Sequence, residues 1–267
     1  LEQYLKMVSM VARQVSHFEP KDVALEPFNE PVACEHSVNG AWAAAQEKIY
    51  RTSRENAPKV TLVLTGDCWG TTKGLPSVNA EIFDENTFFS IHFYDPYLFT
   101  NQGSYSGNAY TNYVNRIHFP PVSADRPRVE NELTGKLTAA SIDDDTKAKF
   151  GGWAKHDIEE YFKSGGGLRP IETTFQTANA WAKEHKINPS RIFVGEFGVR
   201  GEYDGHLAAE PADRAAWLAA VRTASEKYNF NWAVYSIVGP YGIETGGLDL
   251  NGPFAEPLIK ALGLHSK

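Results

Sequence analysis

The sequence lacks the features that mark several common classes of protein. It has no run of about 18 or more apolar residues, so no membrane-spanning helix is expected. Basic residues number 26 against 33 acidic ones, which gives a net charge of -7. Nucleic acid is therefore not an expected partner, because its binding depends on Lys and Arg side chains that meet phosphate.

Cysteine is scarce, since only Cys34 and Cys68 are present. Two cysteines make neither a disulfide framework nor a metal cluster. Each follows one of two neighbouring predicted strands, and adjacent parallel strands lie about 4.8 Å apart, so a disulfide is within reach. Loop residues need not face each other, however, and we favour two free thiols over the bridge.

The motifs of nucleotide-binding loops, serine hydrolases and metal sites are also absent from the sequence. The glycine triplet at residues 165–167 follows a predicted helix, so it is not the phosphate loop that joins a strand to a helix in nucleotide-binding proteins. No G-x-S-x-G motif of serine hydrolases occurs. Of the eight histidines, only His92 leaves a predicted strand end beside other chemical groups, and the rest show no metal-ligand spacing, so no metal ion is expected. The chain begins at Leu1 rather than Met, so the absence of a visible signal peptide says nothing about secretion.

What the sequence does contain is a regular alternation of two patterns. Short apolar runs typical of buried strands occupy residues 22–28, 60–64, 88–93, 191–194 and 231–237. Helical spacing of apolar residues marks 1–16, 41–56, 75–83, 143–162, 170–185, 211–228 and 253–262. The alternation predicts βαβ units and a parallel sheet. Residues 101–140 show no clear period and contain several Tyr, so we predict a wall or lid of a cleft there.

Two predicted strands deliver a carboxylate at their carboxyl ends. The run VALEPFNEP ends in Asn29 and Glu30, and Pro31 stops strand pairing because it has no N–H to donate. The run IFVGEFG presents Glu196 between two glycines, which allow close approach of backbone or ligand. In α/β barrels the chemistry sits at the carboxyl ends of the strands. Taken singly, Asn29 could instead be a cap and each glutamate a solvated side chain.

Two carboxyl groups are what glycoside hydrolysis requires, one to donate a proton and one to attack. When the two lie close together, the negative charge of one raises the pKa of the other. One carboxyl group can then stay protonated as the donor while the other is ionised and attacks. His92 and Tyr94 leave an intervening strand and can hydrogen-bond to such a pair, and the Asn29 amide can hold a sugar hydroxyl. Trp69 follows the second predicted strand and is either a loop anchor or a sugar-stacking platform.

The motifs NEP, HFYDP, GEFG and WAVY, in this order, resemble glycoside hydrolase family 5, the cellulase family of retaining (β/α)₈ barrels. The resemblance runs along the whole chain and implies an α/β fold of the TIM-barrel type. It implies Glu30 as acid/base on barrel strand four and Glu196 as nucleophile on strand seven. His92 and Tyr94 on strand six would orient these carboxylates, and Asn29 would contact the 2-hydroxyl of the sugar. No metal or organic cofactor is implied.

The chain departs from the family pattern at two points. Tyr235 stands where strand eight usually carries a stacking Trp, so Tyr235 is the expected substrate-stacking ring. Only five strands are predicted, which the resemblance numbers four to eight, so strands one to three are expected to be absent. Residues 1–267 would then be a single catalytic-domain fragment of a (β/α)₈ barrel. Its two exposed edge strands predict poor solubility without an upstream segment of roughly 100 residues.

The implied function is a retaining β-glycosidase that acts on a β-1,4-glucan in the manner of an endoglucanase. The alternatives are a β-mannanase or an exo-β-glucosidase of the same family, because the catalytic motifs are shared. A non-catalytic carbohydrate-binding scaffold remains a third possibility for a truncated barrel. The implied partner is a β-glucan, the implied state of a completed barrel is a monomer, and the implied location is secreted or periplasmic.

Overall fold

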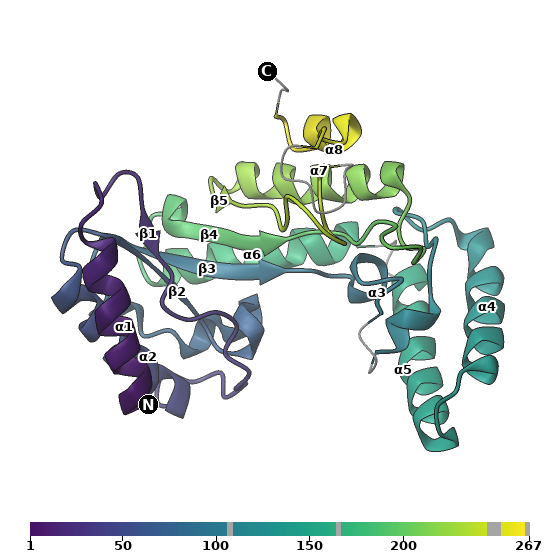
Figure 1. Cartoon of the computed structure of the whole chain (residues 1–267), viewed down its shortest axis with the longest axis horizontal. Helices are drawn as coiled ribbons and strands as arrows, with labels where there is room; N and C mark the ends of the chain where they lie inside the picture. The colour runs from purple at the N-terminus through teal and green to yellow at the C-terminus, as the bar shows by residue number, and fades with distance from the viewer. Residues whose placement is uncertain (106–108, 164–166, 245–251, 265–267) are drawn as a thin grey trace. The chain divides into compact units, whose positions relative to one another are not determined.

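The computed structural model describes residues 1–105, 109–163, 167–244 and 252–264. It divides into two compact units, which we describe separately (Figure 1). Unit 1 comprises Leu1–Phe93, Thr174–Gly195 and Ser225–Ala233, and unit 2 comprises Tyr94–Thr173, Glu196–Ala224 and Val234–Lys267. The single catalytic domain that we expect over 1–267 stays a prediction. Among the described residues, no helix combines the length and apolar character that crossing a bilayer requires.

Unit 1 is built on a five-stranded sheet in the order β1-β2-β3-β4-β5. The strands are β1 Ala24–Leu25, β2 Thr61–Thr65, β3 Thr87–Phe93, β4 Ile192–Phe197 and β5 Asn231–Trp232, of which β4 extends into unit 2 by its last two residues. The pairs β1–β2, β2–β3 and β4–β5 are parallel. All five predicted strands are therefore present and parallel pairing is confirmed for these three pairs, although β1 and β5 are much shorter than expected.

Helices α1 (Glu2–Val15) and α2 (Ala41–Asn56) lie side by side in unit 1 (Figure 1). Val8 of α1 packs with Trp42 and Ile49 of α2 in a buried cluster. Both helices lie where the apolar spacing predicts them. The predicted helix at 75–83 is wrong, because that stretch forms two short 3-10 helices, Thr72–Ser77 and Ala80–Ile82, with Pro76 inside the first.

Strand β3 has two faces of different character. Phe89 packs edge-on against Trp181 at 5.3 Å between ring centroids, and Phe93 packs against Phe175 at 5.6 Å. Trp181 and Phe175 belong to α6 (Leu168–Glu184), so the odd-numbered residues of β3 face this helix. Because side chains alternate along a strand, Ser90 and His92 point to the opposite face. The strand thus buries its phenylalanines on one side and places buried polar groups on the other.

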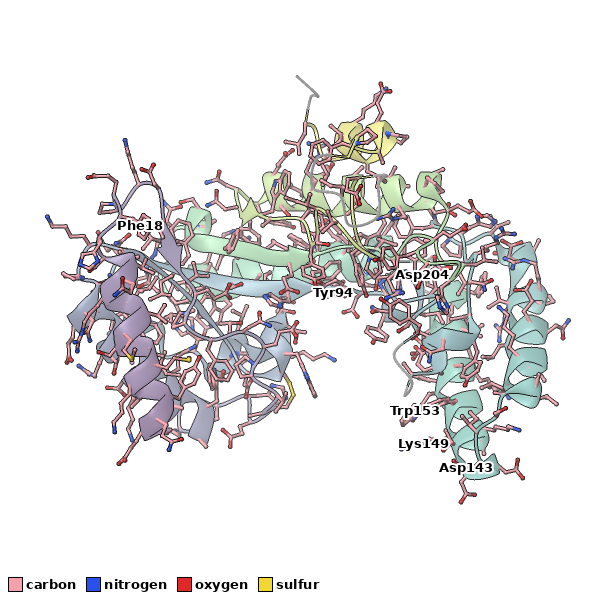
Figure 2. The ribbon with its side chains drawn as sticks, in the orientation of Figure 1. Phe18, Tyr94, Asp143, Lys149, Trp153 and Asp204 are labelled. Atoms are coloured by element: carbon pink, nitrogen blue, oxygen red, sulfur yellow. A yellow bond between two sulfur atoms is a disulfide. The ribbon has the colours of Figure 1, made fainter. Side chains whose placement is uncertain are left out.

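Unit 2 is mainly helical. Its helices are α3 Tyr97–Thr100, α4 Arg126–Ala139, α5 Asp144–Lys163, the start of α6, most of α7 (Pro211–Lys227) and α8 Glu256–Ala261. Helix α5 carries an exposed Trp153, with the Lys149 ammonium 4.7 Å from its ring centroid (Figure 2). Short 3-10 helices elsewhere in the chain are Cys68–Gly70, Tyr110–Tyr113, Ser123–Asp125 and Pro189–Arg191.

The prediction that 101–140 lacks regular structure is wrong for α4. Val129, Leu133 and Leu137 recur every four residues and are buried, and α4 packs against α5. Only these three apolar side chains carry the period, and Gly135 interrupts it with a residue that disfavours helix. Tertiary packing therefore stabilises a helix whose intrinsic pattern is weak.

Candidate active site

Glu30 lies beyond the end of its strand rather than within it. β1 ends at Leu25, and the residues between it and Glu30 include Pro27, which has no N–H for a strand ladder. Glu30 itself has a φ of +35°, a region uncommon for residues other than glycine. The backbone therefore turns sharply at the carboxylate. Asn29 precedes this turn with its side chain exposed.

Within unit 1, Glu30 meets His92. The Nδ1 atom of His92 lies 2.8 Å from Oε1 of Glu30, a distance at which the ring N–H donates to the carboxylate. The His92 side chain is almost fully buried near the end of β3, whereas 35% of the Glu30 side chain is exposed. A buried ring thus contacts a carboxylate that is partly open to solvent. The two residues are therefore in contact, and the orienting role of His92 stays a prediction.

Within unit 2, Glu196 meets Tyr94. The Tyr94 hydroxyl donates to Oε2 of Glu196 at 2.8 Å. Tyr94 directly follows β3, at the tip of its arrow in Figure 2, and Glu196 stands near the end of β4. His92 lies within β3, and Tyr94 is the first residue after it. Each predicted catalytic carboxylate therefore accepts a hydrogen bond from an aromatic side chain, Glu30 from His92 and Glu196 from Tyr94.

Unit 2 also contains an aromatic group that the sequence reasoning missed. The Tyr241 ring lies 6.0 Å from that of Tyr94 and 5.6 Å from that of Tyr235. The Tyr241 phenol is largely buried, and burial raises its pKa above the ordinary tyrosine value. Tyr235 is 45% exposed, so its ring is available to a ligand. The motif VGPYG after the fifth strand was the available signal for Tyr241.

A buried arginine holds the backbone beneath this aromatic group. Arg214 of α7 donates to the carbonyl oxygens of Val199, Tyr241 and Gly242, at 3.0, 3.2 and 2.7 Å. Burial lowers the pKa of its guanidinium to about 10. Because three carbonyls from two segments converge on one side chain, Arg214 fixes the loop that carries Tyr241.

The backbone and the side chain of Trp69 differ in their surroundings. Its backbone N–H donates to the Pro31 carbonyl at 2.8 Å, which ties the loop after β2 to the segment after Glu30. Its side chain is 52% exposed, and its φ of +56° places it in the left-handed region. The backbone is thus a loop anchor, while the ring is exposed as a stacking platform would be.

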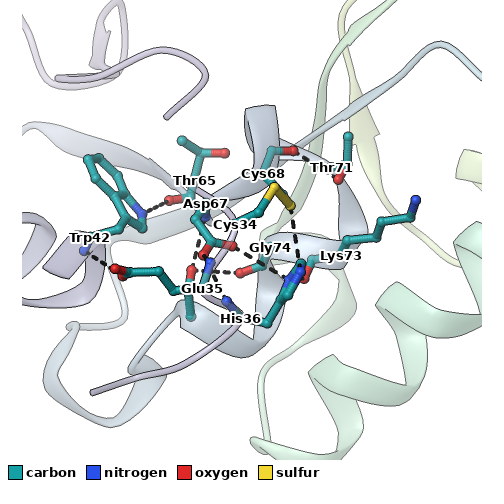
Figure 3. Close-up of polar contacts among 11 residues, drawn as sticks. Cys34, Glu35, His36, Trp42, Thr65, Asp67, Cys68, Thr71, Lys73 and Gly74 are labelled. Carbon is teal, nitrogen blue, oxygen red and sulfur yellow. Dashed lines mark hydrogen bonds and ion pairs between the residues drawn. A yellow bond between two sulfur atoms is a disulfide. The ribbon is translucent and has the colours of Figure 1, made fainter. Parts of the chain in front are cut away.

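The expectation of two free thiols is wrong, because Cys34 and Cys68 form a disulfide with their Cα atoms 4.5 Å apart (Figure 3). The cause is the sharp turn at Cys68, whose φ is +54°. This turn directs the Cys68 N–H to the Ala33 carbonyl and brings the two loops together. Such a turn has no signature in the sequence, since left-handed φ is unusual for cysteine.

One group of potential metal ligands occurs within unit 1, namely Cys34, His36 and Cys68. The thiolate is the form of cysteine that binds metal ions. Because both sulfurs are joined in the disulfide, these three residues do not form a metal site in this structure. The expected absence of a cofactor remains a prediction.

Comparison with known proteins adds three findings. The family Cellulase (glycosyl hydrolase family 5) matches residues 2–239. Endoglucanase 3 of Fibrobacter succinogenes is 26% identical over 269 residues, which cover 99% of this chain and 37% of that protein. The chain therefore spans little more than a third of the curated relative that it matches.

Several solved structures have a similar fold. The cellulose synthase subunit Z from Clostridioides difficile is 21% identical with a TM-score of 0.65, over 98% of this chain and 67% of that one. Thermotoga maritima Cel5A has been solved with cellobiose and with mannotriose, at 19% and 18% identity and TM-scores of 0.65, over 98% of this chain and 66% of each. At these identities the likeness establishes a fold of the (β/α)₈ type.

Proposed function

The chain belongs to glycosyl hydrolase family 5, the cellulase family, and from that premise we propose that it hydrolyses a β-1,4-glucan with retention of anomeric configuration. Glu30 is the acid/base and Glu196 the nucleophile. The observation that carries the proposal is the pairing of each carboxylate with its own aromatic donor at the end of β3, His92 for Glu30 and Tyr94 for Glu196. Unpaired solvated glutamates would need no such partners.

In the first step the Glu196 carboxylate attacks the anomeric carbon while the bond from that carbon to the leaving oxygen breaks. Glu30 gives its proton to the leaving oxygen, which departs as a hydroxyl. The Tyr94 hydroxyl fixes the orientation of the attacking carboxylate through its hydrogen bond to Oε2. The product of this step is a glycosyl ester of Glu196 with inverted configuration.

In the second step water takes the place of the departed sugar. Glu30, now a carboxylate, accepts a proton from the water as the water oxygen attacks the anomeric carbon and the ester bond to Glu196 breaks. The second inversion restores the β configuration. His92 bonds to Oε1 of Glu30, so we assign the proton transfers to Oε2.

We assign substrate contacts to three exposed side chains, those of Asn29, Trp69 and Tyr235. The Asn29 amide contacts the 2-hydroxyl of the sugar being cleaved. The half-exposed rings of Trp69 and Tyr235 stack on sugar faces, because a flat aromatic surface fits against the face of a sugar ring. The structural likeness to Cel5A bound to cellobiose supports a glucan.

A β-mannan is the second candidate substrate, and the likeness to Cel5A bound to mannotriose favours it over other sugars. Parallel measurement of kcat/KM on cello-oligosaccharides and manno-oligosaccharides separates the two. We expect the larger value for the glucan. An exo-β-glucosidase would release single glucose units from chain ends, whereas the proposed endo action shortens long chains rapidly.

We also propose that β1 to β5 correspond to barrel strands four to eight. The sequential order of the sheet supports this numbering, since consecutive barrel strands are neighbours. A secreted or periplasmic location is proposed as well, supported by the Cys34–Cys68 disulfide, because disulfides persist in oxidising compartments. A monomer is the proposed state.

The direct test of the proposal follows the anomeric proton by NMR during hydrolysis of cellotetraose. The β-anomer of the new reducing end should appear first, before mutarotation. Prior appearance of the α-anomer would mean inversion and would contradict the assigned mechanism. Absence of any hydrolysis, together with retained glucan binding in Glu196→Gln and in the unaltered protein, would instead identify a carbohydrate-binding scaffold.

A further inference from the structure

The sheet does not hold Glu30 in place. Strand pairing of β1 ends at Leu25, before the carboxylate is reached. Val32 and the residues Cys34 to His36 are exposed, so the segment after Glu30 runs over the surface. A carboxylate that must give a proton to a particular oxygen needs a backbone that does not drift. Something other than the strand has to provide that restraint.

The loop after β2 restrains this segment at successive points. The N–H groups of Trp69 and Cys68 donate to the carbonyl oxygens of Pro31 and Ala33. The disulfide joins Cys34 to Cys68. Residues 31–36 are therefore bound at successive points to one loop, and Figure 3 shows the disulfide among these restraints.

Asp67 supplies the last restraint, and it is a fully buried carboxylate. Its Oδ2 accepts the N–H groups of Glu35 at 2.6 Å and of His36 at 2.9 Å (Figure 3). Its own N–H donates to the Ser77 hydroxyl at 2.9 Å, which orients the residue. The nearest basic group is His36, whose Nδ1 lies 4.0 Å from Oδ1 and 2.7 Å from the Lys73 carbonyl.

Burial of a carboxylate is costly unless hydrogen bonds or a cation compensate for the lost water. Asp67 is compensated chiefly by two backbone N–H groups of the segment that follows Glu30. The packing around it is tight, since a Cβ atom at Gly74 would meet the Asp67 carbonyl oxygen at 2.0 Å. A buried charge in a closely fitted site holds two surface residues in one place.

We propose that Asp67, acting with the Cys34–Cys68 disulfide, is a positioning residue that keeps Glu30 at its hydrogen bond with His92. The inference rests on the proposed role of Glu30 as acid/base. Loss of the restraint lets the segment 31–36 move and carries Glu30 with it. A displacement of about 1 Å at a catalytic group costs on the order of 100-fold in rate.

The test compares Asp67→Asn with Asp84→Asn, a matched change at the other end of the strands. In Asp67→Asn one amide oxygen remains to accept both loop N–H groups, but the negative charge is lost, and with it the charge assistance that strengthens both hydrogen bonds. Two substrates are used, cellotetraose with a poor leaving group and 2,4-dinitrophenyl β-cellobioside with a good one. Misplaced acid catalysis should lower kcat/KM for cellotetraose roughly 10- to 100-fold and for the aryl substrate less than about threefold. Asp84→Asn should leave the ratio of the two kcat/KM values unchanged.

A second readout does not depend on activity. The buried His92 Nδ1–H, bonded to Glu30, should give a slowly exchanging downfield proton resonance, which His92→Gln identifies by its loss. The resonance should weaken or vanish in Asp67→Asn and persist in Asp84→Asn. The double variant Cys34→Ala/Cys68→Ala provides an independent arm with the same expected results, should Asp67→Asn not fold.

Two outcomes overturn the inference. The first is a His92 resonance that persists in both Asp67→Asn and the cysteine double variant. The second is an equal loss of kcat/KM on the two substrates, which indicates a general structural role. If the unaltered protein hydrolyses neither substrate, the proposed function fails, and the resonance alone then decides whether Asp67 positions Glu30.

Discussion

Two carboxylates of unit 1 lie at opposite ends of β3 and are held in different ways. Asp84, at the amino end, binds Arg54 through both oxygens, at 2.7 and 2.9 Å, and accepts the Thr87 hydroxyl at 2.9 Å. Burial alone would raise the pKa of Asp84. The hydrogen bonds from Arg54 and Thr87, together with the positive charge of Arg54, outweigh burial and lower that pKa. Glu30, at the carboxyl end, is held by the His92 imidazole.

The two carboxylates are suited to different tasks, Asp84 to stabilising the fold and Glu30 to exchanging protons. A carboxylate fully engaged by a guanidinium cannot readily give or take a proton, so Asp84 suits the task of joining α2 to the start of β3. A carboxylate held on one oxygen by a ring can exchange protons through the other. This division matches the general arrangement of (β/α)₈ barrels, in which the carboxyl end carries function and the amino end stability.

Removal of the nucleophile should have the largest effect. In Glu196→Ala no glycosyl ester forms, so kcat should fall on the order of 10⁵-fold or more for every glucan substrate. Thermal melting should stay close to that of the unaltered protein, because Glu196 is partly exposed. A comparable fall in kcat from Asp84→Asn would contradict the proposed difference between the amino and carboxyl ends of β3.

Removal of the acid/base should have a smaller and selective effect. In Glu30→Ala, hydrolysis of cellotetraose should fall by roughly 10² to 10⁴-fold, the range of general acid catalysis. An aryl cellobioside with a good leaving group should still give a burst of phenol, followed by a slow second step that lacks its general base. Stopped-flow absorbance measures the burst. Loss of the burst together with the steady rate would count against this role of Glu30.

At the amino end we expect loss of stability without loss of activity. Asp84→Asn should lower the free energy of unfolding by about 1 kcal/mol, a value limited by solvent screening because 41% of the side chain is exposed. The folded-state pKa of Asp84 is lowered, so its contribution is present above the unfolded pKa of about 3.9 and is lost as pH falls through the folded value. Urea titrations of both proteins should therefore differ at pH 7 and converge below about pH 4. A difference that grows with acid would contradict the sign of the shift.

The smallest effects are expected at the stacking rings. Trp69→Ala and Tyr235→Ala should each weaken glucan binding by about 1 kcal/mol, roughly fivefold in KM, and leave the melting temperature nearly unchanged. Burial of a core aromatic would instead be worth about 3 to 5 kcal/mol of stability. Unchanged KM with a large fall in melting temperature would make these rings packing residues.

The parts of the molecule that the sequence predicts are those with a repeating local pattern. The five strands and most helices follow apolar periodicity, Glu30 comes after β1, and Glu196 lies near the end of β4. The motifs single out the four residues of the contacts His92–Glu30 and Tyr94–Glu196, and the orienting roles of His92 and Tyr94 stay predictions.

What the sequence could not predict depends on contacts between distant residues. The disulfide requires the left-handed turn at Cys68, and α4 depends on packing against α5 that a weak period does not reveal. Tyr241 joins the site through a loop fixed by Arg214 of α7. In each case the decisive term is tertiary, since local propensity at these positions is neutral or unfavourable.

Azide rescue tests the central assignment of roles most directly. With an activated aryl cellobioside, azide should restore turnover of Glu30→Ala by attacking the glycosyl ester of Glu196, and the product should be the β-glycosyl azide. In Glu196→Ala, azide should replace the missing nucleophile and attack the opposite face of the sugar, which gives the α-glycosyl azide. NMR of the two products reads the configuration. The account predicts β from Glu30→Ala and α from Glu196→Ala, and the reverse pair of anomers would contradict it.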